Sequence, residues 1–212
     1  MRQLSVKEEL ANAISHGIGA ILCVIGTYIL IRYAQRIDHF KLMQSYSIYG
    51  FCITFLFTAS TLYHSFSSEF VKKKLRIFDH IGIYLMIAGT YTPFMWITVN
   101  NSWGTAILIA VWTIAIIGII FKVFFTGRFE KLSLVSYLVM GWLLIVGVKP
   151  MLETIHANGL WLLLAGGLSF TIGTVFYRWH KLAYHHAIWH VFVMLGGAFH
   201  YFAILYYSYP SK

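Results

Sequence analysis

The sequence contains little charge. Asp, Glu, Lys and Arg make up 11% of its 212 residues, and acidic residues number only 7. Because a soluble domain carries about 25% charged residues, this composition excludes an ordinary water-soluble fold. Hydrophobic residues make up 59% of the chain. We therefore predict an integral membrane protein whose length is used up by membrane spans and short loops.

Features of secreted and modular proteins are also missing. The two cysteines, Cys23 and Cys52, lie inside apolar stretches and form no CxxC motif, which indicates small core residues without a redox role. No cleavable signal peptide is evident, since the first apolar segment is longer than the apolar region of such a signal. Ser/Gly linkers, low-complexity tracts and internal repeats are absent from the sequence. We expect one membrane domain over residues 1–212.

Seven apolar segments have the length of a membrane-spanning helix, about 20 residues. They cover residues 14–35, 45–66, 80–99, 103–125, 132–149, 159–178 and 185–207. The fifth is short and ends at Lys149-Pro150. Residues 1–13 are predicted to form a helical lead-in at the membrane surface. The predicted fold class is an all-α integral membrane protein built as a seven-transmembrane-helix bundle.

Basic residues are spread unevenly over the predicted loops. With seven spans, 11 of the 16 Lys and Arg residues fall on the side of the N-terminus. The positive-inside rule then predicts a cytoplasmic N-terminus and a C-terminus outside. Topology thus explains the net charge of +9, and no nucleic-acid partner is expected.

The densest basic run lies in the predicted loop 67–78. It consists of Lys72, Lys73, Lys74 and Arg76. The simpler interpretation is a solvated loop that only sets orientation. The more specific hypothesis is that these side chains contact anionic lipid head groups.

Polar residues gather where the predicted spans meet the cytoplasmic side. Four segments contribute them: Glu9, Asn12 and His16; Ser60 and His64; Asp79; and His186 and His190. Within a segment these residues are three, four or seven positions apart, so they share one face of a helix. Burying ionisable groups costs several kcal/mol unless they are paired or bind a metal. A metal site would offset this cost for all of them together.

His64, His186 and His190 form the hypothetical ligand set. Three neutral imidazoles suit Zn²⁺, which keeps a fourth position for water, although iron, cobalt and nickel also accept such ligands. Asp79 would accept a proton from that water, and Ser60 would bind the water or support the ligands. An outer polar shell that orients the ligands or closes the cytoplasmic mouth is predicted from Glu9, Asn12 and His16.

Each of these features also has a simpler explanation. A His-x-x-x-His pair at a helix end is often interfacial, a carboxylate can cap a helix, and a serine can bond to its own helix. His80 and His185 point about 100° away from their neighbours and are expected at the membrane interface. His200 lies about 21 Å beyond His186 along a helix, too far for the same metal, so it is expected in packing or in a cavity.

The polar residues together form one long motif. It reads Glu9-x-x-Asn12-x-x-x-His16, Ser60-x-x-x-His64, Asp79 and His186-x-x-x-His190, and the run EELANAISHGIGA leads into the first span. This motif resembles the haemolysin III family, the bacterial branch of the progestin and adiponectin receptor (PAQR) superfamily. The resemblance implies a seven-helix protein of the bacterial plasma membrane, with zinc held by the three histidines beside Ser60 and Asp79. The superfamily is similar to membrane ceramidases, which implies hydrolysis of a lipid amide or ester.

Three functions are weighed on this basis. The first is a zinc-dependent, ceramidase-like hydrolase that acts on membrane lipid and affects membrane homeostasis. The second is a non-enzymatic sensor or regulator of membrane state, with zinc as a structural clamp. The third is a pore-forming cytolysin, which the lack of a secretion signal and of an amphipathic stripe disfavours. Membrane lipid is the expected partner, and no obligate protein partner can be inferred.

Overall fold

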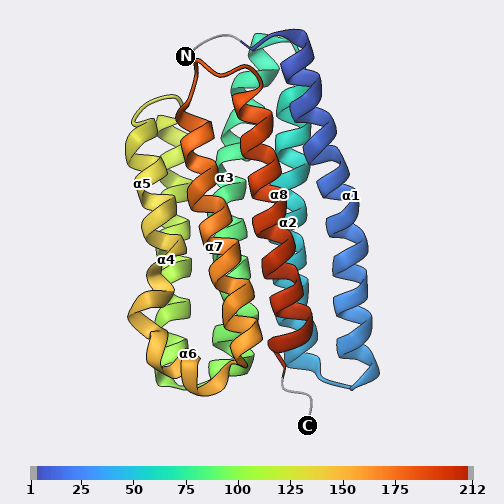
Figure 1. The fold of residues 1–212 in the computed structure, drawn as a ribbon, viewed down its shortest axis with the longest axis vertical. Coiled ribbons are helices and arrows are strands. Elements are labelled where there is room, and N and C mark those ends of the chain that lie inside the picture. Colours follow the sequence, from blue (N-terminus) through green and yellow to red (C-terminus); the bar gives the residue numbers. More distant parts are fainter. Residues whose placement is uncertain (1–3, 210–212) are drawn as a thin grey trace.

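Helices form all the regular structure between residues 4 and 209, the part of the chain that this computed structural model describes. They are α1 (Val6–Arg36), α2 (Phe40–Ser65), α3 (Glu69–Pro93), the π-helix η1 (Phe94–Val99), α4 (Ser102–Phe125), α5 (Glu130–Gly141), the 3₁₀ helix η2 (Leu143–Gly147), α6 (Val148–Thr154), α7 (Ala157–Arg178) and α8 (His185–Tyr207). The long helices run side by side as a bundle (Figure 1). The prediction of an all-α fold is confirmed. Arg2 and Lys212, which contribute to the predicted orientation, lie outside the described residues.

Six helices are long and apolar enough to cross a membrane. They are α1, α2, α3 continued by η1, α4, α7 and α8. The count rises to seven if α5 with η2 and α6 form one broken span, whose halves meet at 60°. These six to seven candidate spans identify a multi-pass membrane protein.

The prediction of one continuous helix over residues 132–149, as the fifth span, is wrong. The α-helix stops at Gly141, and the chain continues through η2 into α6. The hydroxyl of Tyr91, on α3, lies 3.1 Å and 2.9 Å from the carbonyl oxygens of Met140 and Gly141, and it accepts from the backbone N–H of Leu144 at 2.9 Å. These bonds satisfy backbone groups that the break leaves free, which makes the break tolerable within an apolar environment.

The predicted lead-in is not a separate element. Ser5 caps α1: its hydroxyl accepts from the N–H of Glu8, and the Glu8 carboxylate accepts from the N–H of Ser5 at 2.9 Å. This capping box starts a helix of 31 residues that continues without a break into the first span. Glu9, Asn12 and His16 therefore lie on the first turns of a transmembrane helix.

The predicted loop 67–78 is also wrong. The helix α3 starts at Glu69, so the basic run from Lys72 to Arg76 lies on its first turns. Lys, Leu and Arg are good helix formers, whereas hydropathy alone places the start of the span after the charges. The basic side chains are consequently held on a rigid helix.

Packing between helices brings four helix ends together at one end of the bundle. The helix α1 packs against α2 and α8, α2 packs against α3, and α7 packs against α8. The start of α1, the end of α2, the start of α3 and the start of α8 all lie at the same end (Figure 1). The residues of the polar motif lie on these four helix ends.

Candidate metal centre

Three histidine side chains from two helices converge at this end. His64 comes from the last turn of α2, and His186 and His190 come from the first two turns of α8. One ring nitrogen of each lies within 4.8 Å of the others. The ring centroids are 5.0 Å apart for His64 and His186 and 4.7 Å apart for His186 and His190. One ion has room to contact all three.

The ring of His64 is oriented by a carboxylate. Its Nδ1 lies 2.6 Å from Oε2 of Glu9, and its Nε2 is buried without a hydrogen-bond partner in residues 4–209. Because Nδ1–H donates to the carboxylate, the lone pair of the neutral ring is on Nε2. A histidine held in this way by a carboxylate is the usual arrangement of a metal ligand.

The ring of His190 is oriented by the backbone of α1. Its Nδ1 lies 3.2 Å from the carbonyl oxygen of Asn12 and 3.2 Å from the hydroxyl of Ser15. Donation to the carbonyl leaves the lone pair on Nε2, as in His64. His16 stacks on His190 with centroids 3.5 Å apart, and neither of its ring nitrogens has a hydrogen-bond partner among the described residues. The sequence analysis missed Ser15.

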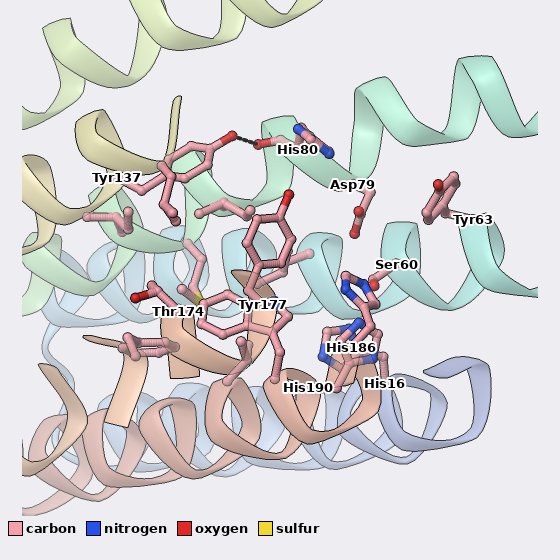
Figure 2. A pocket seen from close by; sticks show the side chains of 18 of the residues that line it. His16, Ser60, Tyr63, Asp79, His80, Tyr137, Thr174, Tyr177, His186 and His190 are labelled. Carbon is pink, nitrogen blue, oxygen red and sulfur yellow. Dashed lines mark hydrogen bonds between the residues drawn. The ribbon is translucent and has the colours of Figure 1, made fainter. Parts of the chain in front are cut away.

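A carboxylate and a hydroxyl stand next to the histidines. Figure 2 shows Asp79, on α3, and Ser60, on α2, beside His186 and His190. Ser60 is buried, and its hydroxyl lies next to the carboxylate of Asp79. The structure thus brings together all eight residues that the sequence analysis assigned to the site.

The histidines open onto a large cavity. Its volume is about 840 Å³, and the end with the histidine cluster carries His64, Asp79 and His186. Beyond that end the walls are largely apolar and aromatic, with Val193, Met86 and other side chains from α3, α5, α7 and α8. A polar end and an apolar body suit an amphiphilic ligand.

Comparison with known proteins identifies the family. The family described as "Haemolysin-III related" matches residues 4–201.

The chain belongs to the haemolysin III family.

Relatives agree with this assignment. Hemolysin-3 of Bacillus cereus is 47% identical over 206 residues, which cover 97% of this chain and 94% of the relative. The hemolysin-3 homolog of Bacillus subtilis (strain 168) is 44% identical over 96% of this chain and 95% of its own length. The human monocyte to macrophage differentiation factor is 30% identical over 96% of this chain and 86% of its own length. The predicted resemblance is confirmed, and the six to seven apolar helices agree with a bacterial cell membrane protein.

A second polar cluster of this haemolysin III family member centres on Glu130. Its carboxylate lies 3.2 Å from Arg76 Nη2, 3.4 Å from Lys122 Nζ and 3.7 Å from His80 Nδ1. The interfacial placement predicted for His80 is wrong, since this residue of α3 is buried and its ring faces the carboxylate of Glu130 on α5. Sequence reasoning missed Lys122, although a lysine inside an apolar segment was a signal that a partner exists.

His185 also departs from its prediction. It is buried rather than interfacial, and its Nδ1 lies 3.2 Å from the carbonyl oxygen of Phe176 on α7. The turn before it is tied to α1, because Glu8 accepts from the N–H of Tyr184 at 3.0 Å. Glu8, which the sequence analysis passed over, therefore fixes where α8 begins and so where its histidines lie.

The basic run is divided between two roles. Lys72 pairs with Glu9 at 2.5 Å and stands over the ring of Tyr63, and Arg76 pairs with Glu130. These two side chains line the cavity, whereas Lys73 and Lys74 are exposed. Contact with anionic lipid stays a prediction for the exposed Lys73 and Lys74, of which Lys74 also stands over the ring of Phe70.

Proposed function

We propose that this haemolysin III family member is a metal-dependent hydrolase that cleaves an amide or ester bond of a membrane lipid. One observation carries the proposal: three imidazoles and the Asp79 carboxylate meet at one end of a largely apolar cavity of about 840 Å³. The head of a lipid would lie at the polar end, and its chain would lie among the apolar walls. Cleavage of this lipid would affect membrane homeostasis.

The donor set supports Zn²⁺ as the metal. In His64 and His190 the Nδ1 atom already donates a hydrogen bond, so Nε2 is the free ligand atom, and in His64 it is a buried atom without a partner among the described residues. Three neutral imidazoles with a further position left open are typical of catalytic zinc. When bound, zinc supplies Lewis-acid polarisation of the carbonyl group and activation of water.

The surrounding side chains would carry the proton transfers. In the proposed reaction a water oxygen attacks the carbonyl carbon, and Asp79 accepts the proton that the water loses. Ser60 donates a hydrogen bond to the carbonyl oxygen as negative charge develops on it. The carbon–nitrogen or carbon–oxygen bond then breaks, and Asp79 returns the proton to the leaving amine or alcohol. Glu9 holds His64 in place throughout.

Metal content and lipid turnover test the proposal together. Purified protein should hold about one zinc per chain and hydrolyse a fluorescent ceramide or a phospholipid ester. His186→Ala should lose both zinc and turnover. Asp79→Asn should keep zinc and lose turnover by roughly 10²- to 10⁴-fold, the range for general acid–base catalysis. The control is His156→Ala, since His156 is exposed and lies in another part of the chain. Full turnover in a zinc-free triple histidine variant would overturn the proposal.

A structural role for the metal is the second candidate. Contacts between α1 and the ligands favour it, because Glu9 bonds His64 and the Asn12 carbonyl bonds His190, so the site joins α1, α2 and α8. A sensor or regulator of membrane state would need this clamp and no chemistry. Asp79→Asn would then leave function intact, while the histidine variants would unfold.

Haemolysis is the third candidate, since two relatives carry the name hemolysin-3. The largely apolar walls of the cavity are unsuited to a wide aqueous pore. Purified protein added to erythrocytes should cause no size-limited leakage that osmolytes block. Such leakage would move this candidate to first place.

We also propose seven spans with the N-terminus in the cytoplasm. Two observations support this: the start of α1 and the end of α8 lie at opposite ends of the bundle (Figure 1), and the basic residues are concentrated on the N-terminal side. Alkaline phosphatase fused to the C-terminus should then be active, whereas a fused green fluorescent protein should stay dark. The opposite result would reverse the orientation.

A further inference from the structure

A histidine lines the largely apolar part of the cavity, far from the histidine cluster. His200, on α8, lines the cavity ten residues beyond His190. Ten residues of helix correspond to a rise of about 15 Å. The cavity wall near it includes Val193, Leu163 and Phe170, all apolar. His200 therefore offers the cavity a polar group far from the metal end.

The ring of His200 is held in place by α7. Its Nε2 lies 3.2 Å from the carbonyl oxygen of Leu163, and its centroid is 5.5 Å from that of Phe170. The ring lies directly over Gly166, where an added Cβ would be 2.2 Å from Cδ2 of His200. The lack of a side chain at position 166 is what makes room for the imidazole.

The other ring nitrogen is left as a hydrogen-bond acceptor. Nε2–H donates to the Leu163 carbonyl, so the lone pair of the neutral ring is on Nδ1. The edge formed by Nε2 and Cδ2 faces α7, which turns Nδ1 away from that helix. Nδ1 makes no hydrogen bond within residues 4–209. Polar atoms among apolar walls nearly always have a partner, because leaving one unpaired is costly.

We propose that His200 Nδ1 accepts a hydrogen bond from a hydroxyl group near the far end of a lipid chain bound in the cavity. The inference rests on the proposed function, because it places the head of that lipid at His64, His186 and His190. It adds a preference for acyl chains hydroxylated at or near their end. Only a long chain reaches His200, so chain length and the hydroxyl group are recognised together.

Paired fatty acids test this preference. Radiolabelled palmitate and ω-hydroxypalmitate are bound separately to zinc-loaded protein in lipid nanodiscs, and the measurement is repeated with octanoate and ω-hydroxyoctanoate. We expect the wild type to bind ω-hydroxypalmitate roughly three- to tenfold more tightly than palmitate, as one net hydrogen bond provides. The octanoate pair should show no such preference, because its extended chain is shorter than the rise of about 15 Å between His190 and His200.

Variants at the far end identify the group responsible. His200→Phe should abolish or reverse the preference, since a hydroxyl would then face an apolar ring. His200→Gln keeps an acceptor and should retain part of the preference. Gly166→Ala should weaken it by displacing the imidazole. Phe202→Leu, on the exposed side of α8, is the matched control and should leave it unchanged. Zinc content should be equal in all of them.

The possible failures can be told apart. If the wild type binds palmitate and ω-hydroxypalmitate equally well, the inference is overturned, and water is the hydrogen-bond partner of His200. The proposed hydrolase is not affected by that result. A preference that survives His200→Phe overturns it as well. Binding of neither palmitate nor ω-hydroxypalmitate overturns both the inference and the proposed lipid cavity.

Discussion

Two polar clusters lie at the same end of the bundle and differ in how their buried atoms are satisfied. In the cluster around Glu130, the charges of Arg76 and Lys122 each lie within 3.4 Å of the carboxylate. In the histidine cluster, Nε2 of His64 and both ring nitrogens of His16 have no hydrogen-bond partner among the described residues. In the Glu130 cluster both basic side chains are thus paired within the chain, and only Nδ1 of His80, 3.7 Å from the carboxylate, lacks a hydrogen-bond partner among the described residues.

We therefore expect the two clusters to have different roles, a structural role for the Glu130 cluster and ligand binding for the histidine cluster. A buried charge that is paired stabilises the packing of its helices and needs nothing more. The buried Nε2 of His64, in a ring that Glu9 orients, has no partner among the described residues, and this supports the proposed metal ligand. Removal of a charge should therefore damage stability in the Glu130 cluster, whereas removal of an orienting group should damage metal affinity in the histidine cluster.

The largest effect is expected from Glu130→Ala. Lys122 is fully buried, and the substitution leaves its charge without the carboxylate. The free energy of unfolding should fall by about 3–5 kcal/mol, as measured by thermal or SDS-induced unfolding in detergent. Zinc per folded chain should stay the same. Glu69→Ala, at an exposed glutamate on α3, is the control and should change stability by less than about 0.5 kcal/mol. Equal stability of the two variants would contradict the structural role.

Removal of the metal should have the next largest effect. Zinc that binds only the folded protein stabilises it by about 2.7 to 4.1 kcal/mol when free zinc is 100 to 1,000 times its Kd. A chelator should lower the unfolding temperature of the wild type accordingly. The same chelator should leave His186→Ala unchanged, because that variant has no metal to lose. A chelator effect of the same size in both proteins would place the stabilising metal elsewhere.

Glu9→Gln should weaken zinc binding more than it changes the fold. The amide keeps the size of the side chain but loses the charge that orients His64, so zinc affinity should fall by about 10- to 100-fold in a competition titration. Lys72→Gln removes the other partner of Glu9 and serves as the control. If Lys72→Gln weakens zinc binding as much, Glu9 acts through the ion pair and not through His64.

Ser5→Ala should give the smallest effect. Loss of the capping box should lower the free energy of unfolding by about 1 kcal/mol without changing zinc affinity. Ser68, the residue before α3, makes no side-chain capping bond, so Ser68→Ala should be nearly neutral. A marked loss of zinc affinity in Ser5→Ala would show that the start of α1 is coupled to the histidine cluster.

Much of the site could be predicted because its signals are local. Four-residue spacing places Ser60 with His64, and His186 with His190, on common helix faces, and hydropathy sets most of the spans. Hydropathy failed where charge and helix overlap. It started the third span only at residue 80, after Lys72 and Arg76, although these residues belong to the same helix. It also could not show that the α-helix ends at Gly141, where the Tyr91 hydroxyl of another helix bonds the backbone.

By itself, the sequence determined the helical membrane fold, the family and the residue types available for a metal, since these follow from composition, periodicity and one long motif. Only the tertiary structure decided which partner each buried polar atom receives. Glu9 is 55 residues from His64 in the chain, and Glu130 is 54 residues from Arg76. Such pairings depend on how helices pack in three dimensions, and no local pattern encodes them. Packing therefore decided that the charges of one polar cluster are paired within the chain, whereas ring nitrogens of the other are left without a partner among the described residues.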